Sequence, residues 1–286
     1  MSSITKVRIF ADSISDIPQE WIEKYNINLI PLYIAFDERT YLDRIEMDRF
    51  QVYKKIEMTG KFPEIAVPEP SVFINAFSPI IQNGEDVLFI SMSSELSSMY
   101  QNSLIAAREF PAGRVTVVDS KNISAGTAMN VFIAVQAAEQ GKSALYISGL
   151  LRRKRDEIQF NVLVDGYENR LKRGRVNIIK QLLGSKLRIQ PILYVSHGRI
   201  LSGVKYRGNK QKVLRKLLDS ILSQIHRIEQ DQIIIAQNKE EETAEWIQRK
   251  IYEETNIRDV FIIEGGCAIC SHSGTHSLGI SFVLKS

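Results

Sequence analysis

The chain has 286 residues, 44% of them apolar and 24% charged, which excludes a disordered or fibrous protein and leaves room for two domains. The net charge of +4 is too small to indicate nucleic acid, and no apolar run approaches the roughly 20 residues that cross a bilayer. The two cysteines are too few for a disulfide scaffold, and the first residues lack a signal-peptide segment, so we expect a cytoplasmic protein.

Short apolar runs alternate with amphipathic segments in the first half of the chain. Strands are expected at residues 7–11, 27–34, 87–90 and 115–118. Helices are expected at residues 19–25, 48–58, 71–81 and 127–140. Pro31 interrupts the second strand and indicates an edge strand or a bulge, and the proline-rich residues 61–70 are expected to be irregular. The alternation predicts an α/β domain over residues 1–150, with a Rossmann-like parallel sheet.

The pattern changes from about residue 144. Helices are expected at residues 145–155, 167–173, 210–228 and 240–254. Strands are expected at residues 159–164, 187–195, 199–202, 204–207, 232–236, 260–263 and 279–284. Several of these strands follow one another directly, which predicts an α+β domain over residues 151–286 with a mixed or mostly antiparallel sheet.

A cluster of serines joins the strand at 87–90 to the helix that should follow it. Apolar residues at i, i+3, i+4 and i+8 from Leu96 predict that helix. Between the two elements stand Ser91, Ser93, Ser94, Ser97 and Ser98. A helix N-terminus offers unpaired amides and partial positive charge, and hydroxyls add uncharged donors. One serine would be explained as an N-cap, but five in eight residues predict a pocket for a carboxylate or a phosphate.

Two other strand ends carry the polar pairs Asp12-Ser13 and Asp119-Ser120. Ligands of open α/β sheets bind at the carboxyl ends of the strands, so these ends predict one polar patch. No G-x-G-x-x-G follows the first strand and no G-x-x-x-x-G-K-[ST] occurs, so neither a dinucleotide site nor a P-loop is indicated. No G-x-S-x-G elbow indicates a serine hydrolase.

Seven segments of the chain form an ordered series of motifs. They are ADSISDIP at 11–18, NLIPLYI at 28–34, SSELSSMYQNS at 93–103, VVDS at 117–120, LKRGRV at 171–176, IQPIL at 189–193 with GRI at 198–200, and SHSGTHSLGISF at 271–282. Together they resemble the DegV family of bacterial fatty-acid-binding proteins, whose hallmark is S-S-x-L-S-G-T-Y-Q-S. Each segment alone is a weak signal, but this order over this length is specific.

The resemblance implies a lipid-binding protein that holds one long-chain fatty acid between its two domains. It implies a carboxylate head group near Ser93, Ser94, Ser97, Ile65, Ala66 and His272. Arg207 and Arg175 match family positions for contact with a phosphate or a partner. The best understood members present the carboxylate to a separate fatty acid kinase, which forms acyl phosphate for phospholipid metabolism. The resemblance therefore implies a carrier, not an enzyme, with no metal or cofactor.

The chain departs from the family pattern around the expected head group. Ile65-Ala66-Val67-Pro68 stands where the family has Thr-Ser-Gln-Pro, so the loop hydroxyls are missing. Ser98-Met99 replaces Gly-Thr, and Gly274-Thr275-His276 replaces Gly-Pro-Gly. Two alternatives stay open: a divergent lipid-binding regulator without a kinase, and an enzyme acting on a small carboxylated or phosphorylated substrate.

Two further groups have simpler interpretations. Cys267-Ala-Ile-Cys270 could bind zinc only with added ligands such as His272 and His276, and the segment resembles a family strand and turn that bind no metal. The basic runs at 152–155 and 172–175 are typical of solvated helix faces, or of a docking face for an acidic kinase. Nucleic acid is not indicated, because no aromatic residues interleave with them.

Overall fold

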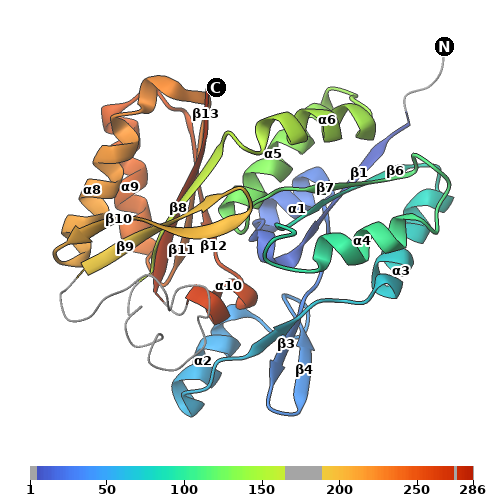
Figure 1. The fold of residues 1–286 in the computed structure, drawn as a ribbon, viewed down its shortest axis with the longest axis horizontal. Helices are drawn as coiled ribbons and strands as arrows, with labels where there is room; N and C mark the ends of the chain where they lie inside the picture. Colours follow the sequence, from blue (N-terminus) through green and yellow to red (C-terminus); the bar gives the residue numbers. More distant parts are fainter. Residues whose placement is uncertain (1–4, 165–188, 274–275, 286) are drawn as a thin grey trace.

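The computed structural model describes residues 5–164, 189–273 and 276–285. Its first sheet is parallel (Figure 1). Its strands, in the spatial order β2-β1-β6-β7, are β2 (Asn28–Ile30), β1 (Val7–Asp12), β6 (Asp86–Ser91) and β7 (Val115–Asp119). Residues 87–90 of β6 are completely buried, as in a central strand covered on both faces. The expected parallel sheet is confirmed.

One helix lies between the parallel sheet and the second large sheet. The helices of the N-terminal half around the parallel sheet are α1 (Gln19–Tyr25), α3 (Pro70–Gln82), α4 (Met99–Ala107), α5 (Ala125–Glu139) and α6 (Ala144–Lys154). Helix α5 contacts β1 and β6 on one side and β8, β11 and β13 on the other (Figure 1). Twelve of its 15 residues are buried, because a helix packed on all sides is apolar on all sides.

The expected strand at 27–34 is two strands that belong to different sheets. Pro31 lacks the N–H needed to continue the ladder, so β2 ends before it and β3 (Tyr33–Phe36) starts after it. Strand β3 pairs antiparallel with β4 (Arg39–Leu42) and β5 (Glu64–Ala66). Strand β5 lies in the segment expected to be irregular, where prolines limit it to three residues. Next to this small sheet, α2 (Arg49–Thr59) begins with a capping box between Asp48 and Gln51.

The second half contains a mixed six-stranded sheet, as expected. Its strands, in the spatial order β10-β9-β8-β13-β11-β12, are β10 (Arg199–Arg207), β9 (Ile189–Ser196), β8 (Ile158–Val164), β13 (Ser277–Leu284), β11 (Ile228–Asn238) and β12 (Asp259–Glu264). Strands β11 and β12 pair in parallel, and the other neighbouring pairs are antiparallel. Helices α8 (Lys210–Leu222) and α9 (Glu241–Glu254) pack on this sheet (Figure 1).

Three local expectations in this half are wrong. The strands at 199–202 and 204–207 form one strand, β10, with an irregularity between Ser202 and Lys205. The helix expected at 210–228 ends at Leu222, because Ile228 already pairs with Leu284 in the sheet. The segment around the two cysteines is a helix, α10 (Cys267–Ser273), whose buried residues occupy one face. The helix expected at 167–173 lies outside the described residues.

The two halves share one continuous hydrophobic cluster. It combines residues such as Ile90 and Phe132 with Ile234 and Ile263 of the six-stranded sheet. Trp21 of α1 packs on Phe132 and on Phe261 of β12, with ring centroids 4.8 and 5.0 Å away. The division into domains at residue 150 therefore stays a prediction. Among the described helices, none has the length and apolar character needed to span a membrane.

Candidate functional site

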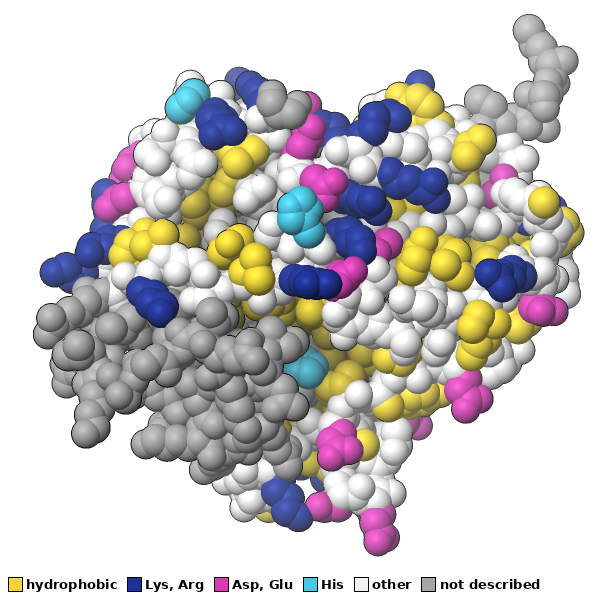
Figure 2. Space-filling model, viewed as in Figure 1, with side chains coloured by type: hydrophobic (Ala, Val, Ile, Leu, Met, Phe, Trp, Pro, Cys, Tyr) yellow, Lys and Arg dark blue, Asp and Glu magenta, His cyan; other side chains and the backbone are white. Residues whose placement is uncertain are grey.

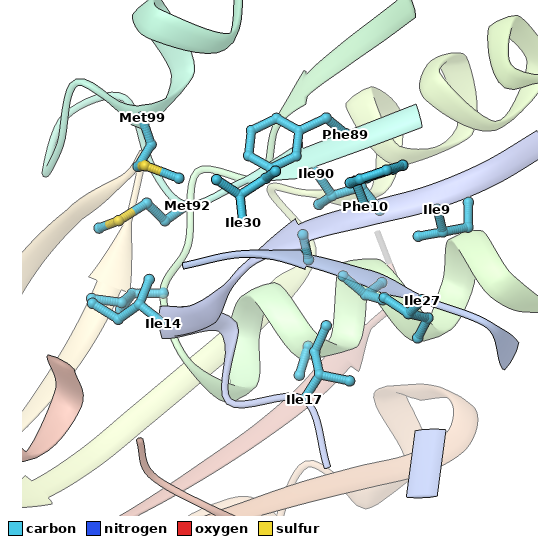
Figure 3. Packing of buried hydrophobic residues seen from close by; sticks show 14 of the residues in the cluster. Ile9, Phe10, Ile14, Ile17, Ile27, Ile30, Phe89, Ile90, Met92 and Met99 are labelled. Atoms are coloured by element: carbon cyan, nitrogen blue, oxygen red, sulfur yellow. The ribbon is translucent and has the colours of Figure 1, made fainter. Parts of the chain in front are cut away.

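The carboxyl ends of β1, β6 and β7 meet at one edge of the parallel sheet, as expected. The amide of Met92, just after β6, donates to Oδ2 of Asp12 at 2.6 Å. The amide of Ser94 donates to Oδ1 of Asp119 at 3.2 Å on the other side. Met92 and Met99 are buried, and Figure 3 shows them side by side beneath the loop that joins them. The start of residues 92–98, which we call the serine loop, is therefore held by β1 on one side and by β7 on the other.

The serine loop is longer than the sequence pattern indicated. Leu96 was expected on the first turn of the helix, but α4 begins only at Met99. The amides of Leu96 and Ser97 both donate to the carbonyl oxygen of Ser93, at 3.0 and 3.2 Å. This tight turn delays the helix, so every serine of the cluster precedes it.

Two of the predicted head-group serines donate their hydroxyls to protein acceptors. Ser93 Oγ is completely buried and donates to the carbonyl oxygen of Gly198 at 2.8 Å. Ser94 Oγ donates to Oδ2 of Asp119 at 2.6 Å and accepts from Nζ of Lys121 at 2.9 Å. A hydroxyl has one hydrogen to donate, so these two side chains brace the loop.

Ser97 differs from both, because its hydroxyl hydrogen is not used within the described residues. Its Oγ accepts from the amide of Met99 at 3.2 Å. The amides of Ser98, Tyr100 and Gln101 also have no acceptor among the described residues. Ser97 and the start of α4 thus form a set of hydrogen-bond donors with partial positive charge, which suits an anion.

The segment with the altered family motif lies against α4. Ile65 and Ala66 stand in β5, where Ile65 pairs with Ile34 and Ala66 is exposed. Beyond this strand, Nδ2 of Asn102 on α4 donates to the carbonyl oxygen of Pro68 at 2.9 Å. Because Ile65 and Ala66 carry no hydroxyl, these two residues offer only backbone groups and apolar surface.

His272 stands on α10, which contacts β5 and α2. The side chain is exposed, yet surrounding protein lowers the pKa of His272 below its usual value by desolvating the charged ring. Because its pKa is lowered, the His272 ring is neutral at pH 7. Figure 2 shows a hollow with hydrophobic side chains in its wall on the viewed face of the molecule.

The predicted arginines are less closely tied to this arrangement. Arg207 is the last residue of β10, where its backbone pairs with Ile189, and its side chain lies outside the described structure. Arg175 also lies outside the described residues. The other end of the same hairpin contacts the serine loop, since Arg199 pairs with Glu95 at 3.0 Å. His276 pairs instead with Glu240 at 3.1 Å.

A group of three buried carboxyls is the feature that sequence reasoning missed. Asp12, Asp16 and Asp43 are each at most 2% exposed. Burial raises the pKa of Asp12 to about 6 and that of Asp16 to about 7, and it raises the pKa of Asp43 as well. The D-S-x-x-D turn contains two of them, but turn residues are usually exposed, so the sequence did not indicate their burial.

Cys267 and Cys270 are buried free thiols beside these carboxyls. Cys267 donates to the carbonyl oxygen of Met47 at 3.2 Å, and Cys270 donates to the hydroxyl of Tyr53 at 3.2 Å. Burial raises the pKa of both thiols, that of Cys270 to about 12. Among the described residues, no group of three or more His, Cys, Asp or Glu is placed to hold a metal ion.

A family model described as an uncharacterised protein of the DegV family matches residues 6–285. This chain belongs to the DegV family. A DegV domain-containing protein of Clostridium acetobutylicum is 29% identical over 282 residues, which cover 98% of this chain and 99% of the relative.

Solved DegV structures have the same fold. The structure of a DegV family protein from Thermus thermophilus, described by its fatty acid binding, is 27% identical, covers 98% of this chain and 100% of its own, and has a TM-score of 0.86. DegV of Bacillus subtilis, described as a fatty acid binding protein, is 24% identical with a TM-score of 0.82, and its coverage is 98% and 100%. At 24% identity, the likeness to the Bacillus subtilis protein supports the fold alone.

Proposed function

We propose that this protein binds a long-chain fatty acid whose carboxylate lies at the N-terminus of α4, between an N-terminal domain of residues 1–150 and a C-terminal domain of residues 151–286. The observation that carries the proposal is the unused donor set of Ser97 and the first amides of α4. The likeness to the Thermus thermophilus protein, which is described by its fatty acid binding, supports it.

The chemistry of the site fits a carboxylate better than a free hydrophobic end group. A buried carboxylate must be hydrogen-bonded, because otherwise its pKa rises and it becomes neutral. Ser97 and the amides of Ser98 and Tyr100 supply hydrogen bonds without a formal charge. His272 adds no counter-ion, because its lowered pKa keeps the ring neutral. Burial of the acyl chain contributes about 0.8 kcal/mol per CH₂, so the tail needs no polar contacts.

The donor set suits a carboxylate, and the sequence has no G-x-S-x-G elbow that would make one of the serines a nucleophile. We therefore assign the protein a carrier role, in which it presents the carboxylate to a separate fatty acid kinase in the cytoplasm. Ser93 and Ser94 hold the serine loop in this scheme, and Ile65 and Ala66 border the head group with apolar surface.

Denaturing mass spectrometry of the protein purified from cells tests the ligand. We expect one stoichiometric fatty acid of roughly 14–18 carbons. Burial of such a tail contributes about 0.8 kcal/mol per CH₂, which is enough for tight binding. A water-soluble ligand, or no ligand together with no binding in a fatty-acid titration, would overturn the proposal. Acyl phosphate formation with a fatty acid kinase and ATP then distinguishes a carrier from a lipid-binding regulator without a kinase.

A further inference from the structure

The start of α10 is attached to the opposite half of the protein by a buried carboxyl group. The amide of Gly266, one residue before α10, donates to Oδ1 of Asp16 at 2.7 Å. The other oxygen of Asp16 accepts from Oγ of Ser124 at 2.5 Å. Asp16 is 2% exposed, and these two residues are 250 positions apart, so this bond ties the end of the chain to its beginning.

Asp43 is a second buried carboxyl beside the first. Its Oδ2 accepts from Oγ of Ser13 at 2.7 Å. Its Oδ1 has no well-aligned hydrogen-bond partner in the described chain, although Cys267 lies near enough for its amide and thiol to stabilise the charge. Asp43 is 1% exposed, so its ionised form loses hydration that these few contacts replace incompletely.

Few charges compensate this cluster. The titratable and charged groups that face Asp16 and its surroundings are Arg44, Asp12, Asp43, Cys267, Cys270 and Tyr53. Two cations act on this surrounding set among the described residues. Arg44 faces Asp16 and donates to the carbonyl oxygen of Ile17 at 2.7 Å, whereas Arg49 acts on Tyr53 and Cys270 and pairs with Glu264. Desolvation is the largest influence on Asp16 and favours its protonated form.

Helix α10 also carries His272 and contacts β5, which borders the proposed head group. We propose that Asp16 is a positioning residue: its hydrogen bond with Gly266, which we call the clasp, holds the start of α10 in place. The placement of that helix, and with it fatty-acid affinity, then depends on protonation of Asp16. The affinity part rests on the function proposed above. Asp16 touches no ligand in this scheme and acts only through Gly266.

The sign of the dependence follows from hydration. When α10 lifts away, water reaches Asp16 and its carboxyl ionises near the ordinary value, whereas in the clasped state it holds its proton up to about pH 7. Lifting therefore releases a proton, so a rise in pH favours it. For one proton, the lifting equilibrium increases by up to about tenfold between pH 6 and pH 8.

Hydrogen–deuterium exchange of the apoprotein measures the clasp directly. We expect the peptide covering residues 265–273 to lose protection between pH 6 and pH 8, after correction for the intrinsic exchange rate. Asp16→Asn should abolish this pH dependence, because Asn keeps the acceptor for Gly266 and tolerates the left-handed φ of 55° at this position. Equal pH dependence in the wild type and in this variant would overturn the inference.

Asp12→Asn is the matched control. Asp12 is equally buried in the same turn, but within the described part of the chain it accepts from Met92 and Ser15, which belong to its own half. It should therefore retain the wild-type pH dependence at residues 265–273. If Asp16→Asn does not fold, Gly266→Ala replaces it, since the new Cβ would lie 3.3 Å from Oδ1 of Asp16. Unchanged α10 protection in Gly266→Ala would also contradict the clasp.

Fatty-acid titrations at pH 6 and pH 8 test the link to affinity. The ratio of the two dissociation constants should be several-fold larger for the wild type than for Asp16→Asn, and the comparison cancels the pH dependence of the ligand itself. Equal ratios would reject the link. If the wild type binds no fatty acid, the proposed function fails, while the exchange experiment still decides whether the clasp exists.

Discussion

Ser93 Oγ donates a hydrogen bond of 2.8 Å to the carbonyl oxygen of Gly198, 105 positions later in the chain. Gly198 forms the turn between β9 and β10, so the tip of this hairpin rests on the serine loop. A Cβ at Gly198 would lie 2.4 Å from Ser93 Oγ and 2.9 Å from Cδ of Lys121. The serine loop, which was predicted to bind an anion, thus also connects the two halves of the chain through this hydrogen bond.

Gly198→Ala should destabilise the protein by about 2–4 kcal/mol, since it combines overpacking with a left-handed φ of 82°. Gly60→Ala is the control, because Gly60 also has a positive φ, of 65°, but a Cβ there would meet nothing within 4 Å. Its expected cost is about 1 kcal/mol. Urea unfolding of both variants checks the difference, and equal losses would show that the hairpin tip does not press on the serine loop.

Ser97→Ala should weaken fatty-acid binding by roughly tenfold, the effect of losing one hydrogen bond to a charged group. Ser103→Ala on the same helix is the matched control, because the Ser103 hydroxyl donates its hydrogen to the carbonyl oxygen of Tyr100 and has none left for a ligand. Its affinity should stay within about twofold of the wild type. Wild-type affinity in a fatty-acid titration of Ser97→Ala would contradict the assigned donor.

The free energy of unfolding should fall as the pH rises from about 4 to about 7. Asp16 has an ordinary pKa of 3.8 when unfolded and about 7 when folded, so the folded state binds more protons in this window. The shift of about three units corresponds to roughly 4 kcal/mol at most. Denaturant titrations across this range should show a shallower fall for Asp16→Asn than for the wild type. Parallel curves would mean that Asp16 is already ionised in the folded protein.

The two halves should unfold together. Trp21 packs on Phe132 of α5 and on Phe261 of β12, so its fluorescence reports the contact between them. In a Trp246→Phe variant, Trp21 is the single tryptophan left. Its fluorescence and the far-UV circular dichroism should then give one coincident transition, because one hydrophobic cluster includes both halves. Two separated transitions would instead support independently stable domains.

Local patterns were sufficient for most of the fold. The buried run at 87–90 predicted β6, and the apolar segment at 127–140 predicted α5, because burial imposes its composition within a few residues. The three-residue strand β5 and the seven-residue helix α10 escaped prediction, since elements this short are stabilised by their neighbours and carry little periodicity.

The sequence by itself determined the fold class, the family and the place of a polar patch at three strand ends. Only the tertiary structure decided which hydroxyls that patch leaves unused: Ser93 and Ser94 are engaged by Gly198 and Asp119, whereas Ser97 keeps its hydrogen. The tertiary structure also buried Asp16 against Gly266. The physical reason is that periodicity is a local property of the chain. The partner of a hydrogen bond, and the water that a carboxyl loses, depend on segments that meet only when the chain has folded.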